Sequence, residues 1–359
     1  MLKVLTFLGP FCSHFRLTNT DIANSDNTNG YYIIESNDFV YNPRKSADAP
    51  YGPISSYQYP EAGIVSPLYL CFRAKREINP LYFEWYFRSS TWHRYIYMSG
   101  DSGARHDRVS IKDDVFFAMP INVPSAKEQE RISLFLDAIE RRIETQRTLV
   151  ETLKKYKRGL LNKLFSNINS NIYPTVYLSE VADFLQGLTY SPSDVSVSGY
   201  LVLRSSNIQN GMLSFDDCVY VDKKVDESLQ VKCDDVIMCV RNGSKNLVGK
   251  TALIPPNMPM TTWGAFMMII RSKLNDTYIF HYLNSQMFFS QVFKDTGTAT
   301  INQITKGILN ECRLPLPPET ERKQISKMLS SFDAKIQNAE KCLATLVNLK
   351  KALLQQLFI

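Results

Sequence analysis

The chain has 359 residues, of which 44% are hydrophobic and 21% charged, and its formal net charge is +6. This length gives room for two domains of ordinary size, each with its own core. No run of 18 apolar residues is present, which argues against a membrane-spanning helix, and the seven cysteines are scattered without a C-x-x-C pair. We therefore predict a cytoplasmic protein with reduced thiols and neither a disulfide framework nor a zinc site.

The first domain is predicted over residues 1–118, where short β-rich runs precede a short helix. Its start, Met1 to Cys12, is interpreted as a strand and not a signal peptide, because it carries one Lys and no small-residue cleavage site. Two loops combine basic, amide and aromatic side chains, which can bind phosphates or base edges. The candidates for DNA contact here are Tyr41, Asn42, Arg44, Lys45, Arg105 and Arg108.

A first long helix is predicted within residues 119–166, after a proline-rich entry. Its apolar residues recur with alternating spacings of 4 and 3, which is the heptad of a coiled coil. Gln146 and Lys157 interrupt this seam, and such polar positions fix helix register at a cost in stability. The residues proposed for helix pairing and subunit docking are Ile132, Leu136, Ile143, Leu153 and Leu160.

The second domain is predicted over residues 167–312 and has the same mixed pattern. Tyr200 to Arg204 and Asp235 to Arg241 are predicted as strands, and Tyr278 to Phe293 as one helix. Polar and basic residues follow the strand ends, where loops carry function. The DNA-contact candidates are Arg204, Asn207, Arg241, Asn242, Lys245 and Lys250. For each candidate in either domain, a role as turn former or surface charge stays open.

The last segment, residues 313–359, repeats the first helix. Residues 124–165 align without a gap on residues 317–358, with thirteen identities. This similarity indicates a duplication, and helices with the same seam are predicted to pair with each other, antiparallel. Ala339 and Lys350 fall at the same interruptions of the seam. The corresponding pairing and docking residues are Ile325, Leu329, Ile336, Leu346 and Leu353.

The basic excess is confined to the two repeated segments, which each carry four more basic than acidic residues. Two interpretations stay open. The charges can belong to solvated helix faces, or they can attract a polyanion that runs alongside the helices.

The two globular blocks are predicted to be divergent copies, with Asp38 opposite Asp235 and the tyrosines at 82 and 86 opposite those at 278 and 282. On this alignment about 25 residues, Tyr173 to Val197, have no counterpart in the first block. The first block either lost a strand or belongs to a longer reading frame. A missing strand would leave an unpaired sheet edge, so we expect the first block to be the less stable of the two.

Catalytic motifs are not evident. The stretch Arg241 to Thr251 resembles a phosphate-binding loop, but five residues separate its glycines where four are needed. The four histidines form no H-E-x-x-H pattern, and a single histidine among aromatics is usually a packed residue. We therefore expect a non-catalytic chain without a bound cofactor or metal.

The chain resembles the specificity subunits of Type I restriction-modification systems. The repeated helices, Pro124 to Phe165 and Pro317 to Phe358, look like that family's conserved spacers. Asp38 to Pro43 with Gly100 to Gly103, and Arg241 to Ile254, look like its target recognition domains.

The resemblance implies an α+β fold, with two mixed α/β target recognition domains separated by two long helices in an antiparallel coiled coil. Each domain would read one half of a bipartite site in double-stranded DNA, and the helices would set the spacing and dock two methyltransferase subunits. Those subunits would bring S-adenosylmethionine, and restriction subunits would join them. No membrane partner is implied. The alternative is a non-DNA coiled-coil scaffold; a stand-alone nuclease or methyltransferase is disfavoured by the missing motifs.

Overall fold

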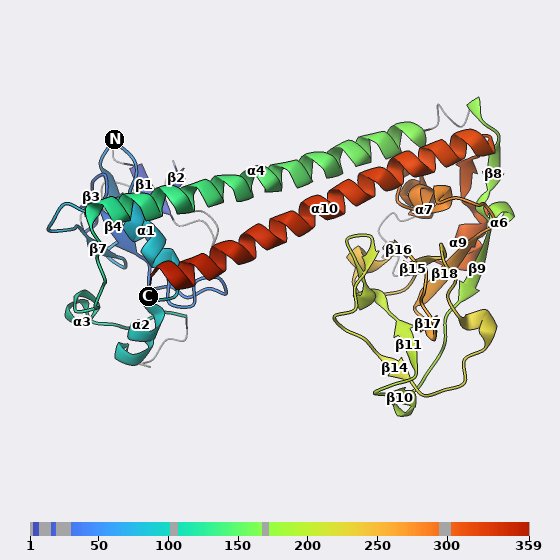
Figure 1. Cartoon of the computed structure of the whole chain (residues 1–359), viewed down its shortest axis with the longest axis horizontal. Helices are drawn as coiled ribbons and strands as arrows, with labels where there is room; N and C mark the ends of the chain where they lie inside the picture. Colours follow the sequence, from blue (N-terminus) through green and yellow to red (C-terminus); the bar gives the residue numbers. More distant parts are fainter. Residues whose placement is uncertain are drawn as a thin grey trace. The chain divides into compact units, whose positions relative to one another are not determined.

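The computed structural model describes residues 3–6, 16–18, 30–100, 107–166, 172–293 and 303–358. The chain divides into two compact units. The first unit is Met1–Thr148 with Glu340–Ile359, and the second unit is Leu149–Ala339. Each unit therefore holds one globular block and one end of each long helix (Figure 1). This division cuts through both helices, so the domain boundaries at residues 118, 166 and 312 stay a prediction.

Two helices of 39 residues each, α4 (Ala126–Leu164) and α10 (Glu319–Leu357), confirm the predicted repeats. A capping box starts α4: the Ser125 amide donates to Glu128 Oε2 at 3.1 Å, and the Glu128 amide donates to Ser125 Oγ at 3.4 Å. This exchange satisfies amides that have no partner within the helix.

The helices pair antiparallel at both ends. In the first unit, Lys350 Nζ lies 2.7 Å from Glu140 Oε2. In the second unit, Lys157 forms the corresponding ion pair with Asp333. Lys157 and Lys350 occupy the same position of the repeat, and so do Glu140 and Asp333. The polar seam residues therefore select one register, as a buried polar group can in a coiled coil.

The predicted seam lies inside the helix pair. None of its residues is solvent-exposed, and Leu136 and Leu329, at the same repeat position, are fully buried. Ile132, Ile143, Leu153, Leu160, Ile325, Ile336, Leu346 and Leu353 are buried or half-buried. These side chains stabilise the helix pair, and a role of theirs in subunit docking stays a prediction.

The second unit is built around a four-stranded antiparallel sheet of order β16-β15-β18-β9. All four residues of β15 are buried, which a continuous apolar run allows. The strands are β8 (Thr175–Tyr177), β9 (Ala182–Gln186), β10 (Val195–Ser196), β11 (Tyr200–Leu203), β12 (Ile208–Gln209), β13 (Met212–Leu213), β14 (Tyr220–Val221), β15 (Val236–Cys239), β16 (Thr251–Leu253), β17 (Thr261–Trp263), β18 (Met267–Ser272) and β19 (Arg313–Pro315).

Short helices cover this sheet. They are α6 (Leu178–Val181), α7 (Tyr278–Leu283), α8 (Gln286–Val292) and α9 (Lys306–Glu311), with 3-10 turns η1 (Pro192–Asp194), η2 (Ser205–Asn207), η3 (Glu227–Leu229) and η4 (Lys245–Leu247). The single helix predicted over residues 278–293 is wrong. Ser285 breaks it, because its hydroxyl accepts from the Phe288 amide at 3.3 Å and caps a new helix.

The first unit has a three-stranded sheet of order β5-β4-β7 and a second sheet of order β2-β1-β6-β3. Its strands are β1 (Lys3–Thr6), β2 (Arg16–Thr18), β3 (Tyr32–Ile34), β4 (Phe39–Tyr41), β5 (Ile54–Ser56), β6 (Gly63–Val65) and β7 (Leu70–Phe72). Its helices are α1 (Pro80–Arg88), α2 (His93–Ser99) and α3 (Asp113–Phe117).

The two blocks are copies of one architecture, as predicted. Sheet β5-β4-β7 corresponds to β16-β15-β18, and β1 lies parallel to β6 as β11 lies parallel to β17. In each block a buried carboxylate binds an arginine through two bonds. Asp38 accepts from Arg73 at 2.5 and 2.8 Å, and Asp235 accepts from Arg271 at 2.8 and 2.7 Å.

The blocks differ at one sheet edge. In the second unit, β9 pairs with β18, and β8 pairs with β19. Within the described part of the first unit, no strand pairs with the corresponding edge of β7. The expectation that the segment beginning at Tyr173 has no counterpart in the first block stays a prediction.

Each unit packs a tyrosine pair against the last residues of a long helix. The centroid of the Phe358 ring lies 5.3 Å from that of Tyr82 and 5.9 Å from that of Tyr86. Phe165 lies 5.1 and 5.8 Å from the rings of Tyr278 and Tyr282.

Truncating the buried seam leucines should destabilise each unit separately. We expect Leu136→Ala to lower the free energy of unfolding of the first unit, and Leu329→Ala that of the second, by about 2–5 kcal/mol, because each leaves a cavity. Hydrogen exchange read unit by unit measures this. Leu349→Ala, at a position 48% exposed, is the control. Equal effects from all three variants would mean that the seam does not hold the helices together.

Candidate nucleic-acid interface

Two loops of the second unit are joined by a side-chain hydrogen bond. Asn242, which follows strand β15, donates from Nδ2 to Ser205 Oγ at 3.1 Å. Its Oδ1 accepts from the Ser244 amide at 2.9 Å. Asn242 thus orders the loop after β15 against the loop after β11. It is half-buried, so its first role is to hold the loops in place.

Arg241 is the exposed basic residue at this junction. Its guanidinium lies 5.3 Å from the centre of the Phe266 ring, which is itself 59% exposed. An arginine held over an aromatic face keeps its planar donors available to phosphates or base edges. Its backbone bridges to Gln303, and a cavity of about 400 Å³ beside it is lined by Gln186, Gln303 and Lys306 among others.

Arg204 and Asn207 are more constrained than the sequence suggested. Asn207 is fully buried: its Oδ1 accepts from the Arg204 amide at 2.9 Å, and its Nδ2 donates to the carbonyl oxygens of Ser214 and Asp217 at 2.9 and 3.0 Å. The prediction that Asn207 contacts DNA is therefore wrong. Arg204 is half-buried, and its Nη2 lies 2.8 Å from Asp217 Oδ2. It would have to exchange this partner to reach a phosphate.

Lys245 and Lys250 are the remaining DNA-contact candidates of the second unit. Lys250 is exposed, and its carbonyl accepts from the Cys239 amide at 2.9 Å, which places it next to the end of β15. Lys245 begins the turn η4, and its side chain lies outside the described residues.

The first unit has a matching basic loop pair. The Lys45 amide donates to the Asp107 carbonyl at 2.8 Å, and the Val109 amide donates to Pro43 at 2.8 Å. Arg44 and Arg108 lie opposite each other in an isolated bridge. Three predicted cations, Arg44, Lys45 and Arg108, are thus brought together, the first two exposed. Arg105 lies outside the described residues.

Tyr41 and Asn42 are corrected by their burial. Tyr41 is 1% exposed, stacks on Phe116 at 5.1 Å, and donates its hydroxyl to the Tyr51 carbonyl at 2.8 Å. Burial raises the pKa of this phenol. Asn42 is buried, and its Oδ1 accepts from the Arg44 amide at 3.0 Å. Neither side chain can reach DNA without unfolding the loop, so the prediction for both is wrong.

Arg44 and Arg241 occupy the same place in their blocks. Each follows the central strand of its sheet, β4 or β15, and each bridges to the segment before the equivalent helix, α3 or α9. The bridge partner differs: it is Arg108 in the first unit and Gln303 in the second. Sequence reasoning missed Gln303 and Phe266, although the exposed aromatic after Gly264 is a usable signal.

No group of three His, Cys, Asp or Glu residues that could hold a metal ion is present in the described ranges. Likewise, none of the helices described is long and apolar enough to cross a membrane.

The comparison with protein families gives the first direct assignment. Residues 173–347 match the family model described as the Type I restriction modification DNA specificity domain. These residues belong to that family.

Relatives of known name agree. The chain is similar to the Type I restriction enzyme EcoKI specificity subunit of Escherichia coli, with 28% identity over 171 residues, which are 45% of this chain and 36% of the relative. It is also similar to the MjaVIII specificity subunit of Methanocaldococcus jannaschii, with 24% identity over 61% of this chain and 56% of the relative. The chain thus spans only part of the length of these relatives.

Solved structures share the fold of this chain over nearly its whole length. A chain from a structure on complex assembly and conformational transition of the type I R-M system aligns with a TM-score of 0.60 and 19% identity, over 94% of this chain and 84% of its own length. The S subunit from M. genitalium aligns with a TM-score of 0.54 and 15% identity, over 94% and 87%.

His281 is expected to make the stability of the second unit depend on pH. It is fully buried, and burial, followed by the charge of Lys157, lowers its pKa to about 3. Its Nε2 lies 3.3 Å from Ser330 Oγ, and its Nδ1 lies 3.8 Å from Asp333. The unfolded chain takes up a proton near pH 6.5, whereas the folded unit does not until about pH 3.

Stability of the second unit should therefore fall as the pH is lowered from 6.5 towards 3, with His281 contributing at most about 1.4 kcal/mol per pH unit. Urea unfolding at several pH values, compared between the wild type and His281→Gln, measures this. The variant should lose less stability over the window. The same pH slope in both proteins would show that His281 does not stay neutral in the fold.

Proposed function

We propose that this chain is the DNA-recognition subunit of a Type I restriction-modification complex. Each globular block binds one half of a bipartite site in double-stranded DNA through the loop after its central strand. The observation that carries this proposal is the position of Arg44 and Arg241, at equivalent strand ends and beside further basic side chains. Arginine is the side chain most often used to read guanine in the major groove.

Two unlike blocks favour an asymmetric site. A symmetric dimer would present identical readers and bind a palindrome. Here Arg44 has Arg108 opposite it, whereas Arg241 has Gln303 opposite it and Phe266 beneath it. The two half-sites are therefore expected to differ in sequence, with a gap set by the helix pair.

The helices are proposed to dock two modification subunits, which bring S-adenosylmethionine; restriction subunits would then join. Support comes from apolar side chains that stay exposed at equivalent repeat positions, Phe135 with Met328 and Tyr156 with Leu349. We take their recurrence in both repeats as support, because exposed apolar patches mark protein-binding surfaces. Methylation and cleavage are assigned to the partner subunits, and the specificity chain itself is proposed to be non-catalytic.

Replacing Arg241 tests DNA reading. We expect Arg241→Ala, in complex with the modification subunits, to lose about 1–3 kcal/mol of affinity for the cognate duplex and to relax specificity in one half-site only. Arg44→Ala should do the same for the other half-site. Lys224→Ala, an exposed cation outside the proposed loops, is the control. Binding titrations and methylome sequencing report the result; unchanged affinity and methylation in both arginine variants would contradict the proposal.

The number of bound modification subunits can be measured directly. We expect Phe135→Asp to remove one modification subunit and Met328→Asp the other, because a carboxylate in an apolar contact loses its hydration. Native mass spectrometry should show one bound subunit in each single variant and none in the double variant. Two bound subunits in the double variant would place the docking surface elsewhere.

A further inference from the structure

The segment that leads into α4 is more exposed over residues 121–124 than its equivalent, residues 314–317, in the second unit. Val123 is 56% exposed, and Pro120 and Asn122 are exposed as well. Of their counterparts in the second unit, Arg313 is exposed, Pro315 is buried and Leu316 is half-buried. Ile121 is half-buried, whereas its counterpart Leu314 is fully buried. The duplication therefore provides an internal comparison between an open and a covered form of one surface.

In the second unit, strand β8 and helix α6 cover this surface. β8 pairs antiparallel with β19, with Val176 opposite Leu314. The ladder extends at both ends: the Leu316 amide donates to the Pro174 carbonyl at 2.8 Å, and the Leu178 amide donates to the Cys312 carbonyl at 2.8 Å. Leu178 is fully buried and belongs to the same core cluster as Leu314.

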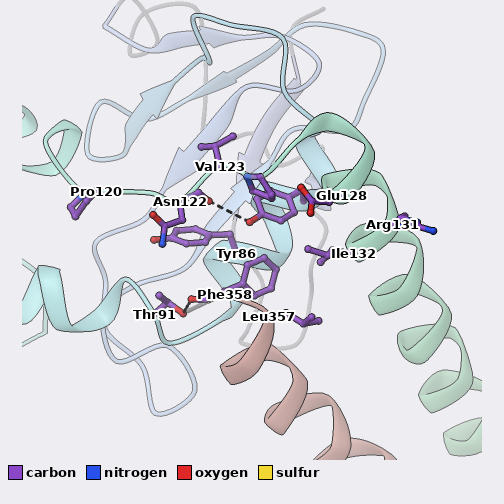
Figure 2. A pocket seen from close by; sticks show the side chains of 12 residues that line it. Tyr86, Thr91, Pro120, Asn122, Val123, Glu128, Arg131, Ile132, Leu357 and Phe358 are labelled. Carbon is purple, nitrogen blue, oxygen red and sulfur yellow. Dashed lines mark hydrogen bonds between the residues drawn. The ribbon is translucent and has the colours of Figure 1, made fainter.

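In the first unit, two cavities flank the open segment. One has a volume of about 710 Å³ and is lined by Tyr82, Tyr86, Asn122, Val123, Glu128 and Phe358 among others (Figure 2). The second, of about 200 Å³, is lined mostly by phenylalanines, with Met119 and Ile121. Over residues 119–122, alternate residues thus face different cavities, as the two faces of a strand do.

The groups that hold β8 and α6 have counterparts beside these cavities. Glu321, which accepts the hydroxyl of Tyr173, corresponds to Glu128 in the larger cavity. Cys312, whose carbonyl accepts from Leu178, corresponds to Met119. Pro120 has no amide hydrogen to donate, but this does not interrupt such a ladder. At the equivalent position of the second unit, the Arg313 amide donates to the Gln291 side chain at 2.7 Å and does not bond β8.

We propose that the first unit binds an extended segment of a second, different polypeptide by strand addition along residues 119–123. The segment has the pattern found in Tyr173–Leu178: Tyr-Pro, then an apolar residue two positions on, then an aromatic residue and Leu. Its backbone pairs with Val123 and Met119, its tyrosine bonds Glu128, and its leucine fills the 200 Å³ apolar cavity. Main-chain pairing supplies affinity and the pockets supply specificity, as in other strand-addition sites.

The first experiment uses a synthetic peptide with the sequence of residues 173–186, labelled for fluorescence anisotropy, and the chain of 359 residues. We expect saturable binding, with new hydrogen-exchange protection at residues 119–123 and 70–72. A peptide with Asp at the position of Leu178 should not bind, because its carboxylate would enter an apolar cavity. This control leaves the protein unchanged, so misfolding cannot explain its result.

A matched pair of chain variants locates the site. Val123→Pro removes the proposed donor amide and should weaken peptide binding about threefold to tenfold. Val197→Pro, at a residue 97% exposed in the second unit, should leave binding unchanged. No detectable binding, equal effects of the two variants, or protection confined to residues 313–316 would each overturn the proposal. Peptide-induced dissociation of a pre-existing dimer would also overturn it, because the occupant would then be a second copy of this chain.

Discussion

The antiparallel pairing of the two long helices is the constraint on which the other features depend. Because α4 and α10 run in opposite directions, the end of the second repeat completes the first globular block, and the end of the first repeat completes the second block. Phe358 packs on Tyr82 and Tyr86, and its carbonyl accepts the Thr91 hydroxyl at 2.7 Å. The lysine–carboxylate pairs fix the helix register. The register therefore also fixes where each block packs on the ends of the helices.

The positions where helix and block meet were kept after duplication, while their polar chemistry changed in pairs. Trp85 donates from Nε1 to Asp137 at 2.9 Å in the first unit. At the equivalent places of the second unit, His281 lies 3.3 Å from Ser330. A buried polar group that loses its partner costs more than the bond contributes, so the two sides of each contact had to change together. At this contact both side chains differ between the units, while its place in the frame is the same.

The sequence predicted the helices, their pairing and the duplicated blocks, because these depend on periodic burial repeated over many residues. Candidate site residues were harder. Tyr41, Asn42 and Asn207 have side chains typical of DNA contacts, yet each is buried by a turn or an aromatic cluster. A short loop sequence does not show whether an amide faces solvent or closes its own turn. Gln303 was missed because its contact with Arg241 joins residues far apart in the chain.

Under the proposed function, two blocks of one architecture would recognise different sequences because the shared frame fixes only where an arginine leaves its strand. Arg44 and Arg241 leave equivalent strands, but the residue across each bridge is a cation in one block and an amide in the other. A guanidinium beside another cation favours phosphate or guanine acceptors, whereas a glutamine can also pair with adenine. Under the proposed function, changing these neighbours would alter the bases that are read without touching the buried Asp–Arg pairs or the helix seam. On this proposal, specificity would diverge in each block separately, while the helices would keep the spacing between the half-sites.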